Sequence, residues 1–126
     1  EENIINHKMQ AEYFRVSPIN WNKITLAKKQ GQKVLAVGTT STRVLETQVF
    51  ERTIRKKVSG WSNCFIYPGW EFRNVSHLLT NFHLPKSTLF LLVSAFMGEK
   101  LAKTAYKEAI SQKYRFFSYG DAMLIL

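Results

Sequence analysis

The sequence predicts an α/β fold, a layered sheet with flanking helices and largely parallel strands. Short apolar or β-favouring runs alternate along the chain with longer segments of helical character. Apolar residues make up 45% of the 126 residues, which is enough for a core. This length suits one domain or one piece of a larger one, and we expect residues 1–126 to form a single α/β domain.

The first half of the chain supplies two predicted strand–helix units. The β-favouring residues 11–16 (AEYFRV) predict a strand. Ser17-Pro18 then provides an N-cap with proline at the first helical position. The apolar residues 33–37 (KVLAV) predict a strand buried on both faces of a parallel sheet, and a hydroxyl-rich turn at residues 38–43 leads into the next helix.

The middle of the chain is expected to be irregular before strand structure returns. Residues 51–62 contain four closely spaced cations and predict an exposed basic loop. Residues 64–67 (CFIY) predict a strand, because they are apolar and β-favouring. The turn dipeptide Pro68-Gly69 is expected to end this strand.

The C-terminal half begins with a strand that carries polar side chains at its end. Residues 78–84 would place Thr80 on one face and Asn81 and His83 on the other, before a turn marked by Pro85. Further elements are predicted as helices at residues 87–97 and 99–113 and strands at residues 115–119 and 123–126. The inward face of the second helix is expected to consist of Leu101, Ala102, Ala105, Tyr106, Ala109 and Ile110.

The charge balance favours an anionic partner. The chain has 18 Lys and Arg against 9 Asp and Glu, a formal net charge of +9. Nucleic acid is the first candidate, and a merely basic, soluble surface is the alternative. The cations expected to contact nucleic acid are Arg52, Arg55, Lys56, Lys57 and Lys86.

Composition argues against several other classes of protein. A single cysteine, Cys64, allows no internal disulfide, and with scattered histidines it gives no metal-ligand pattern, so we expect no metal. No signal peptide is evident, and the apolar run at residues 89–97 is far shorter than the roughly 18 residues of a membrane span. We therefore expect a cytoplasmic protein with no membrane contact. Because the chain starts at Glu1 rather than Met, we expect a fragment or a processed product.

Two strand ends are candidate binding or catalytic sites. The free N–H groups of the turn at residues 38–42 favour a carboxylate or phosphate. The alternative, which the pattern alone favours slightly, is that one hydroxyl simply caps the helix. Arg43 and Glu46 lie three apart and could simply pair with each other. His83 is a candidate acid or base, with Asn81 beside it as a hydrogen-bonding group, and a structural histidine is the alternative.

Two further turns follow the same theme. Tyr67 ends a predicted strand, where it would stack on a flat ring or act as a core tyrosine. Asp121, after Tyr119-Gly120, would be a base, bind a ribose hydroxyl or pair with a cation.

Several blocks of sequence carry a resemblance to a known family. They are HKMQAEYF at residues 7–14, AVGTTSTRVLE at 36–46, FIYPG at 65–69, LLTNFHLPKSTLFLLVSAF at 78–96 and YRFFSYGDAM at 114–123. Their order and spacing resemble the C-terminal part of the S-adenosylmethionine:tRNA ribosyltransferase-isomerase family of queuosine biosynthesis. The resemblance covers essentially the whole chain. It implies a partial, C-terminal segment of a larger α/β domain, without the β-barrel domain that the family inserts.

The resemblance implies a reaction and a partner. The ribosyl moiety of S-adenosylmethionine would be transferred to 7-aminomethyl-7-deazaguanine at the wobble position of a tRNA and isomerised. Epoxyqueuosine-tRNA, adenine and methionine would be the products, with S-adenosylmethionine consumed as a ribosyl donor and no metal required. A full-length member would be a monomer, whereas this chain would be weak or inactive alone and would be prone to self-association through open sheet edges.

The same resemblance suggests roles for the candidate residues. His83 is the first acid/base candidate and Asp121 the second. The residues expected to hold S-adenosylmethionine are Thr39, Thr40, Ser41, Arg43, Tyr67, Asn81 and Tyr119. A non-catalytic, basic tRNA- or nucleotide-binding module is the alternative function. A methyltransferase-like domain is disfavoured, because no glycine-rich loop follows the first strand.

Overall fold

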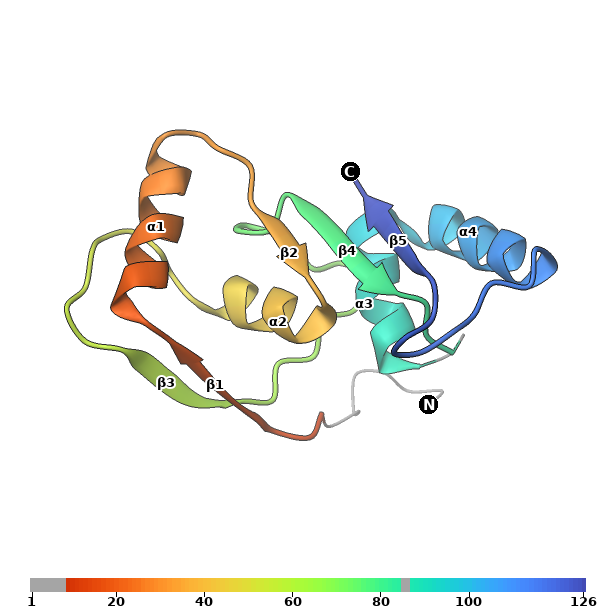
Figure 1. Cartoon of the computed structure of the whole chain (residues 1–126), viewed down its shortest axis with the longest axis horizontal. Helices are drawn as coiled ribbons and strands as arrows, with labels where there is room; N and C mark the ends of the chain where they lie inside the picture. The colour runs from red at the N-terminus through yellow and green to blue at the C-terminus, as the bar shows by residue number, and fades with distance from the viewer. Residues whose placement is uncertain (1–8, 85–86) are drawn as a thin grey trace.

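The computed structural model describes residues 9–84 and 87–126 (Figure 1). The elements in chain order are β1 (Glu12–Val16), α1 (Pro18–Lys29), β2 (Leu35–Val37), α2 (Thr39–Thr47), β3 (Val58–Ser62), β4 (His77–Asn81), α3 (Thr88–Met97), α4 (Glu99–Ser111) and β5 (Ala122–Ile125). The α/β class is therefore confirmed. Within these ranges no helix has the length and apolar character needed to cross a membrane.

The strands form two separate sheets. The larger has the order β2-β4-β5, with β2 parallel to β4 and β5 antiparallel to it. The smaller is an antiparallel ribbon of β1 and β3. Figure 1 shows this ribbon apart from the larger sheet, with α2 between them in the view. The prediction of a largely parallel sheet is wrong, because only β2 and β4 pair in that way among the described strands.

The core lies on one face of the larger sheet. Ala36, Leu78 and Ile125 are neighbours across the three strands, and all are buried together with apolar residues of α3 and α4. The opposite face is open: Val37 is 61% exposed and Leu124 is 54% exposed. The expectation that residues 33–37 are buried on both faces is therefore wrong, because β2 is an edge strand covered on one side only.

Local capping chemistry confirms the predicted starts of two helices. The Ser17 hydroxyl accepts the Asn20 N–H at 3.2 Å at the start of α1, and Ser87 accepts the Phe90 N–H at 3.1 Å at the start of α3. Gly98, with φ of 93°, separates α3 from α4. These helix boundaries could be predicted from the sequence because each depends on only a few neighbouring residues.

Two predicted strands are absent from the structure, and one strand was missed. Residues 64–67 form no ladder, although Ile66 is buried. Residues 115–119 form a turn, since Phe117 and Tyr119 have positive φ values of 70° and 65°. Conversely, β3 lies in the segment predicted as a basic loop, because its pairing with β1 stabilises a strand that its own composition does not favour.

The inward face of α4 is narrower than expected. Ala102, Tyr106 and Ala109 are buried, whereas Leu101 and Ile110 are each 56% exposed. The buried side of this helix packs against α3, Phe82 and Phe116, and the flanking apolar residues are left in solvent.

Candidate functional site

Three of the turns that carry predicted site residues, here called the three polar corners, meet at one edge of the larger sheet: the start of α2 after β2, the end of β4 and the start of β5. The Gly38 N–H, just after β2, donates to Leu79 O at 2.8 Å. The Asn81 side-chain amide, at the end of β4, lies 3.4 Å from Gly120 O and 3.3 Å from Asp121 O, to which it donates. Since β2 runs parallel to β4 and β5 runs antiparallel, the ends of β2 and β4 share this edge with the start of β5.

His83 occupies this edge in an orientation that the strand pattern did not predict. β4 ends at Asn81, so the chain turns before His83. As a result, His83 Nε2 lies 3.3 Å from the hydroxyl of Thr80, although a continued strand would have placed these two side chains on opposite faces. The His83 N–H donates to the Tyr106 hydroxyl at 3.3 Å. Burial lowers the pKa of the His83 imidazole below its ordinary value of 6.5. The ring is therefore neutral at pH 7 and able to accept a proton.

Asp121 is held by its neighbours. Its Oδ2 accepts the Arg115 N–H at 2.7 Å, and its Oδ1 lies 4.0 Å from the Arg115 guanidinium. Of the three hypotheses for Asp121, pairing with a cation is the one for which the structure shows a contact. Gly120 is required at this turn, because a Cβ there would lie 2.6 Å from Arg115 O. Tyr119, next to it, is fully exposed.

The hydroxyl-rich turn becomes the first turn of α2. The helix starts at Thr39, and its N-cap is Gly38, with φ of 89° and no side-chain cap, so a hydroxyl cap is not the explanation of this turn. The Thr42 hydroxyl instead donates to Gly38 O at 2.8 Å. Thr40 and Ser41 remain exposed at this helix start, whereas Thr39 is buried.

The predicted pairing of Arg43 with Glu46 is wrong. Arg43 forms an ion pair with Glu12 of β1. Glu46 is fully buried, and its carboxylate accepts the Trp70 indole N–H at 3.0 Å. Glu46 also accepts three main-chain N–H groups, those of Arg73, Asn74 and Val75, at 2.9, 2.7 and 2.9 Å.

Glu46 is a structural anchor beside the candidate site that the sequence analysis missed. It anchors α2 to the segment that leads into β4, and so it fixes two of the three corners relative to each other. A signal was present, because Thr39, Thr42 and Glu46 follow the spacing of one helical face, and that face is the buried one. A carboxylate on a buried helical face requires several hydrogen-bond donors.

The remaining candidates lie elsewhere or outside the described residues. Tyr67 packs its ring against Phe65, with centroids 5.1 Å apart, and its carbonyl accepts the Trp70 N–H at 3.1 Å. Lys86 is not among the described residues. No group of three or more His, Cys, Asp or Glu in residues 9–84 and 87–126 is arranged to hold a metal ion.

The basic loop is bound firmly to α1. The Asn22 side-chain amide donates to Ile54 O at 3.1 Å, and its carbonyl oxygen accepts the Ile54 N–H at 2.8 Å. The Trp21 indole N–H donates to Arg52 O at 3.0 Å. The exposed cations of this loop are Arg52, Arg55, Lys56 and Lys57. They therefore project from a backbone with a defined position.

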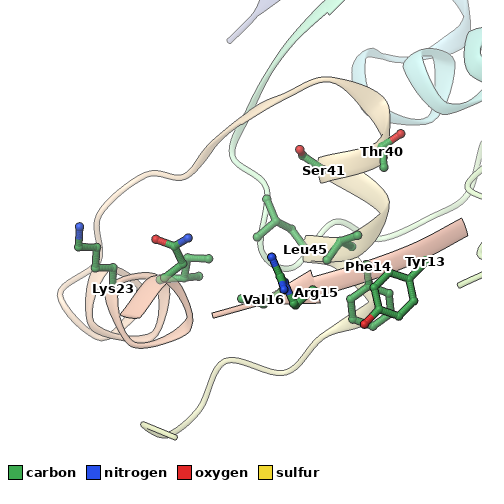
Figure 2. Close-up of a pocket in the computed structure, with 11 residues that line it drawn as sticks. Tyr13, Phe14, Arg15, Val16, Lys23, Thr40, Ser41 and Leu45 are labelled. Atoms are coloured by element: carbon green, nitrogen blue, oxygen red, sulfur yellow. The ribbon is translucent and has the colours of Figure 1, made fainter. Parts of the chain in front are cut away.

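Two cavities of similar size adjoin α2. One, of about 560 Å³, is lined by Arg43, by Thr88 and Leu89 at the start of α3, and by residues 9–12. The other, of about 580 Å³, lies between β1, α1 and α2 (Figure 2). Thr40 and Ser41 line this second cavity, here called the β1–α1–α2 groove. Predicted binding residues therefore line both cavities, Arg43 in the first and Thr40 and Ser41 in the second.

Comparisons with known proteins agree on one family. A family profile described as "Queuosine biosynthesis protein" matches residues 1–125. The chain is 56% identical over 125 residues to the S-adenosylmethionine:tRNA ribosyltransferase-isomerase of Halothermothrix orenii and 50% identical over 124 residues to that of Clostridioides difficile. The matched regions include 99% and 98% of this chain. They include only 37% and 36% of the two longer proteins.

A solved structure shows the same fold. The crystal structure of S-adenosylmethionine tRNA ribosyltransferase from Thermotoga maritima matches with a TM-score of 0.80 and 45% sequence identity. The match covers 90% of this chain and 40% of that one. The described fold therefore corresponds to one part of a longer protein architecture.

Proposed function

The chain belongs to the queuosine biosynthesis protein family, and on that premise we propose that it forms part of an S-adenosylmethionine:tRNA ribosyltransferase-isomerase. The proposed reaction moves the ribosyl moiety of S-adenosylmethionine onto 7-aminomethyl-7-deazaguanine at the tRNA wobble position and isomerises it. Epoxyqueuosine-tRNA, adenine and methionine are the products. Residues 1–126 act as a single α/β domain of a cytoplasmic enzyme that needs no metal and, at full length, is a monomer.

The observation that supports this proposal best is the meeting of three polar corners at one sheet edge. In α/β proteins, ligands bind in the crevice beyond the carboxyl ends of the strands. Here that edge holds Asn81 and His83 from the end of β4, Asp121 from the start of β5 and the start of α2 after β2. All of these belong to sequence blocks that carry the resemblance.

His83 is the proposed acid/base residue. The reaction requires a base near the sulfonium-activated 5′ carbon, and an imidazole that is neutral at pH 7 can accept that proton. The Thr80 hydroxyl, 3.3 Å from Nε2, orients the ring. Asp121 is the second candidate, and its Oδ2 is held in place by the Arg115 main-chain N–H.

The start of α2 is the proposed binding site for the methionine end of S-adenosylmethionine. Thr40 and Ser41 are exposed there, and Thr39 lies behind them. Arg43 would contribute its charge while it remains paired with Glu12. The residues proposed to hold the nucleoside are Tyr67, Asn81 and Tyr119. The cations proposed to contact the tRNA backbone are Arg52, Arg55, Lys56, Lys57 and Lys86.

The test is mass spectrometry of a reaction that contains modified tRNA and S-adenosylmethionine. In a full-length family member with the same sequence blocks, the proposal expects adenine release, and replacing the residue equivalent to His83 with alanine should reduce turnover by roughly 100-fold or more. Turnover near that of the wild type would show that the acid/base role is wrong. For this chain alone we expect weak or no release, because it spans about 37% of its relatives. Rapid adenine release by the 126 residues would contradict that expectation.

A non-catalytic, basic tRNA- or nucleotide-binding module is the second candidate. The ordered basic loop favours it, since Asn22 and Trp21 hold the loop on α1 without any contribution from the candidate active site. Adenine release separates the two functions, because release requires catalysis whereas a gel shift requires only binding.

A further inference from the structure

The β1–β3 ribbon has an outward face that carries two exposed aromatic rings. Strand pairing places Tyr13 opposite Trp61 and Arg15 opposite Ser59, so these four side chains share one face. Trp61 is 72% exposed and Tyr13 is 55% exposed, and their rings meet edge to face with centroids 5.5 Å apart. Two exposed rings in contact form an apolar patch, and such patches often mark an interaction site.

The same face continues into a positively charged groove. Tyr13, Arg15 and Lys23 all line the β1–α1–α2 groove, whose far side carries Thr40 and Ser41. Figure 2 shows the Arg15 side chain rising from β1 between the two helices, with Lys23 on the α1 side. No carboxylate is among the residues that line the groove in the described part of the chain. The nearby Glu12 is neutralised by Arg43.

The basic loop is joined to the β1–β3 ribbon and to α1, two of the elements around this face and groove. The loop leads directly into β3, and its position is fixed on α1, the helix that also carries Lys23. Proteins that bind single-stranded nucleic acid combine cations along the path of the sugar–phosphate backbone with exposed aromatic rings. The phosphates contact the cations, and any base can stack on a ring. An apolar protein partner would not require this charge, and a duplex would not use the rings.

We propose that the Tyr13–Trp61 face and the β1–α1–α2 groove bind unpaired nucleotides of an RNA strand. A base stacks on the aromatic pair, and Arg15 and Lys23 contact the adjacent phosphates. The strand is thereby directed towards Ser41 and the start of α2. This inference rests on the proposed function, since it assigns the surface that receives the unpaired loop of the tRNA substrate.

The test measures fluorescence anisotropy of the 126-residue chain with two labelled probes. One is a single-stranded RNA of about 12 nucleotides and the other is an RNA duplex of the same length. The inference expects the single strand to bind more tightly than the duplex and to quench the fluorescence of Trp61. Trp61 is the most exposed tryptophan, because Trp21 is buried and Trp70 is partly buried.

Substitutions separate stacking from general electrostatics. Trp61→Ala should weaken single-strand binding about tenfold, while Trp61→Phe keeps a ring and retains most of the affinity. Arg15→Ala should remove about one phosphate contact. The slope of log K against log salt concentration should therefore become less negative by roughly 0.7 for a single strand. Lys107→Ala removes the same charge from α4, outside this surface, and should change neither quantity.

The outcomes are distinct from those that test the proposed reaction. Single-strand binding that is unchanged in Trp61→Ala, or equal effects of Arg15→Ala and Lys107→Ala, would overturn the inference even if a full-length member releases adenine. Equal affinity for duplex and single strand would also overturn it. Conversely, suppose that single-strand binding depends on the Trp61 ring but a full-length member releases no adenine. The RNA-binding surface would then be supported, and the proposed reaction would be rejected. Far-UV circular dichroism of each variant shows that it is folded.

Discussion

The Glu46 carboxylate accepts the Asn74 main-chain N–H at 2.7 Å, across a sequence separation of 28 residues. The bond is buried, and it joins α2 to the segment immediately before β4. The start of α2 and the end of β4 both border the candidate site. The position of that site therefore depends on a charged side chain that does not lie in it.

Glu46→Ala should destabilise the fold by about 3 kcal/mol, because it leaves several buried N–H groups without an acceptor. For a chain of this length we expect the melting temperature to fall by roughly 10 °C in a circular dichroism melt. Glu108→Gln is the control, since Glu108 is exposed on α4 and bonds only to Gln112 in the described contacts. A loss of less than about 1 kcal/mol in Glu46→Ala would show that the carboxylate is not an anchor.

The stability of the chain should depend on the titration of His83. Burial lowers the folded-state pKa of His83 below 6.5, so between the two pKa values the unfolded chain binds more protons. The free energy of unfolding should therefore rise with pH across this window and be fully present above about 6.5. His83 is only half-buried, so the effect is modest. Urea unfolding at several pH values checks it, and His83→Asn should remove the dependence; identical pH profiles would contradict the prediction.

Cys64 should react slowly with iodoacetamide in the folded chain. Burial is the main cause that raises the pKa of its thiol above 9.0; the Glu46 charge adds to this, and the Arg43 charge opposes it. At pH 8 little thiolate is present, and the thiolate is the reactive form. Alkylation followed by mass spectrometry should be several-fold faster in urea than in buffer. Equal rates would mean that burial does not protect the thiol.

The basic loop should become sensitive to trypsin when Asn22 is changed. Asn22→Ala removes both hydrogen bonds to Ile54, so the backbone near Arg52 and Arg55 is released for cleavage. We expect cleavage at these sites to accelerate several-fold in a time course read by mass spectrometry. Asn20→Ala, on the same helix but exposed, is the matched control. An unchanged digestion rate in Asn22→Ala would show that the loop is held by other contacts.

Asn81→Ala should loosen the C-terminal corner of the candidate site. The Asn81 amide donates to Gly120 O and Asp121 O at 3.4 and 3.3 Å, so its loss should cost about 1 kcal/mol. Hydrogen exchange at the start of β5 should accelerate, while exchange in α4 stays unchanged. Exchange that accelerates equally in both places would indicate global destabilisation instead.

Local chemistry explains which predictions from the sequence succeeded. Ser17 and Ser87 begin helices because each hydroxyl meets an N–H three residues later, which the sequence alone reveals. The turn at Pro68-Gly69 likewise follows from the two residues themselves, and Gly69 has φ of 108°. The residue types at positions 80–84 also predicted a polar turn after β4. The contacts of His83 could not be predicted, because they depend on where β4 ends.

Long-range pairing explains the failures. β3 is a strand only because β1 lies beside it, and residues 115–119 form a turn because Asp121 holds Arg115 while the Phe117 N–H bonds to Phe82 O. The β1–β3 pairs and the Phe117–Phe82 bond join residues far apart in the sequence, whereas Asp121 lies only six residues after Arg115. The exposure of Leu35 and Val37 follows from their place on an edge strand, which composition does not encode.

The sequence by itself determined the α/β class, the helix starts and, through its characteristic blocks, the family. These depend on short-range capping, on the period of apolar residues and on residue identity. Only the tertiary structure decided that three polar corners meet at one edge, that Glu46 binds main-chain N–H groups rather than Arg43, and that Tyr13 meets Trp61 beside Arg15. The reason is physical: these contacts join residues more than 25 positions apart, and their partners are set by packing and strand register.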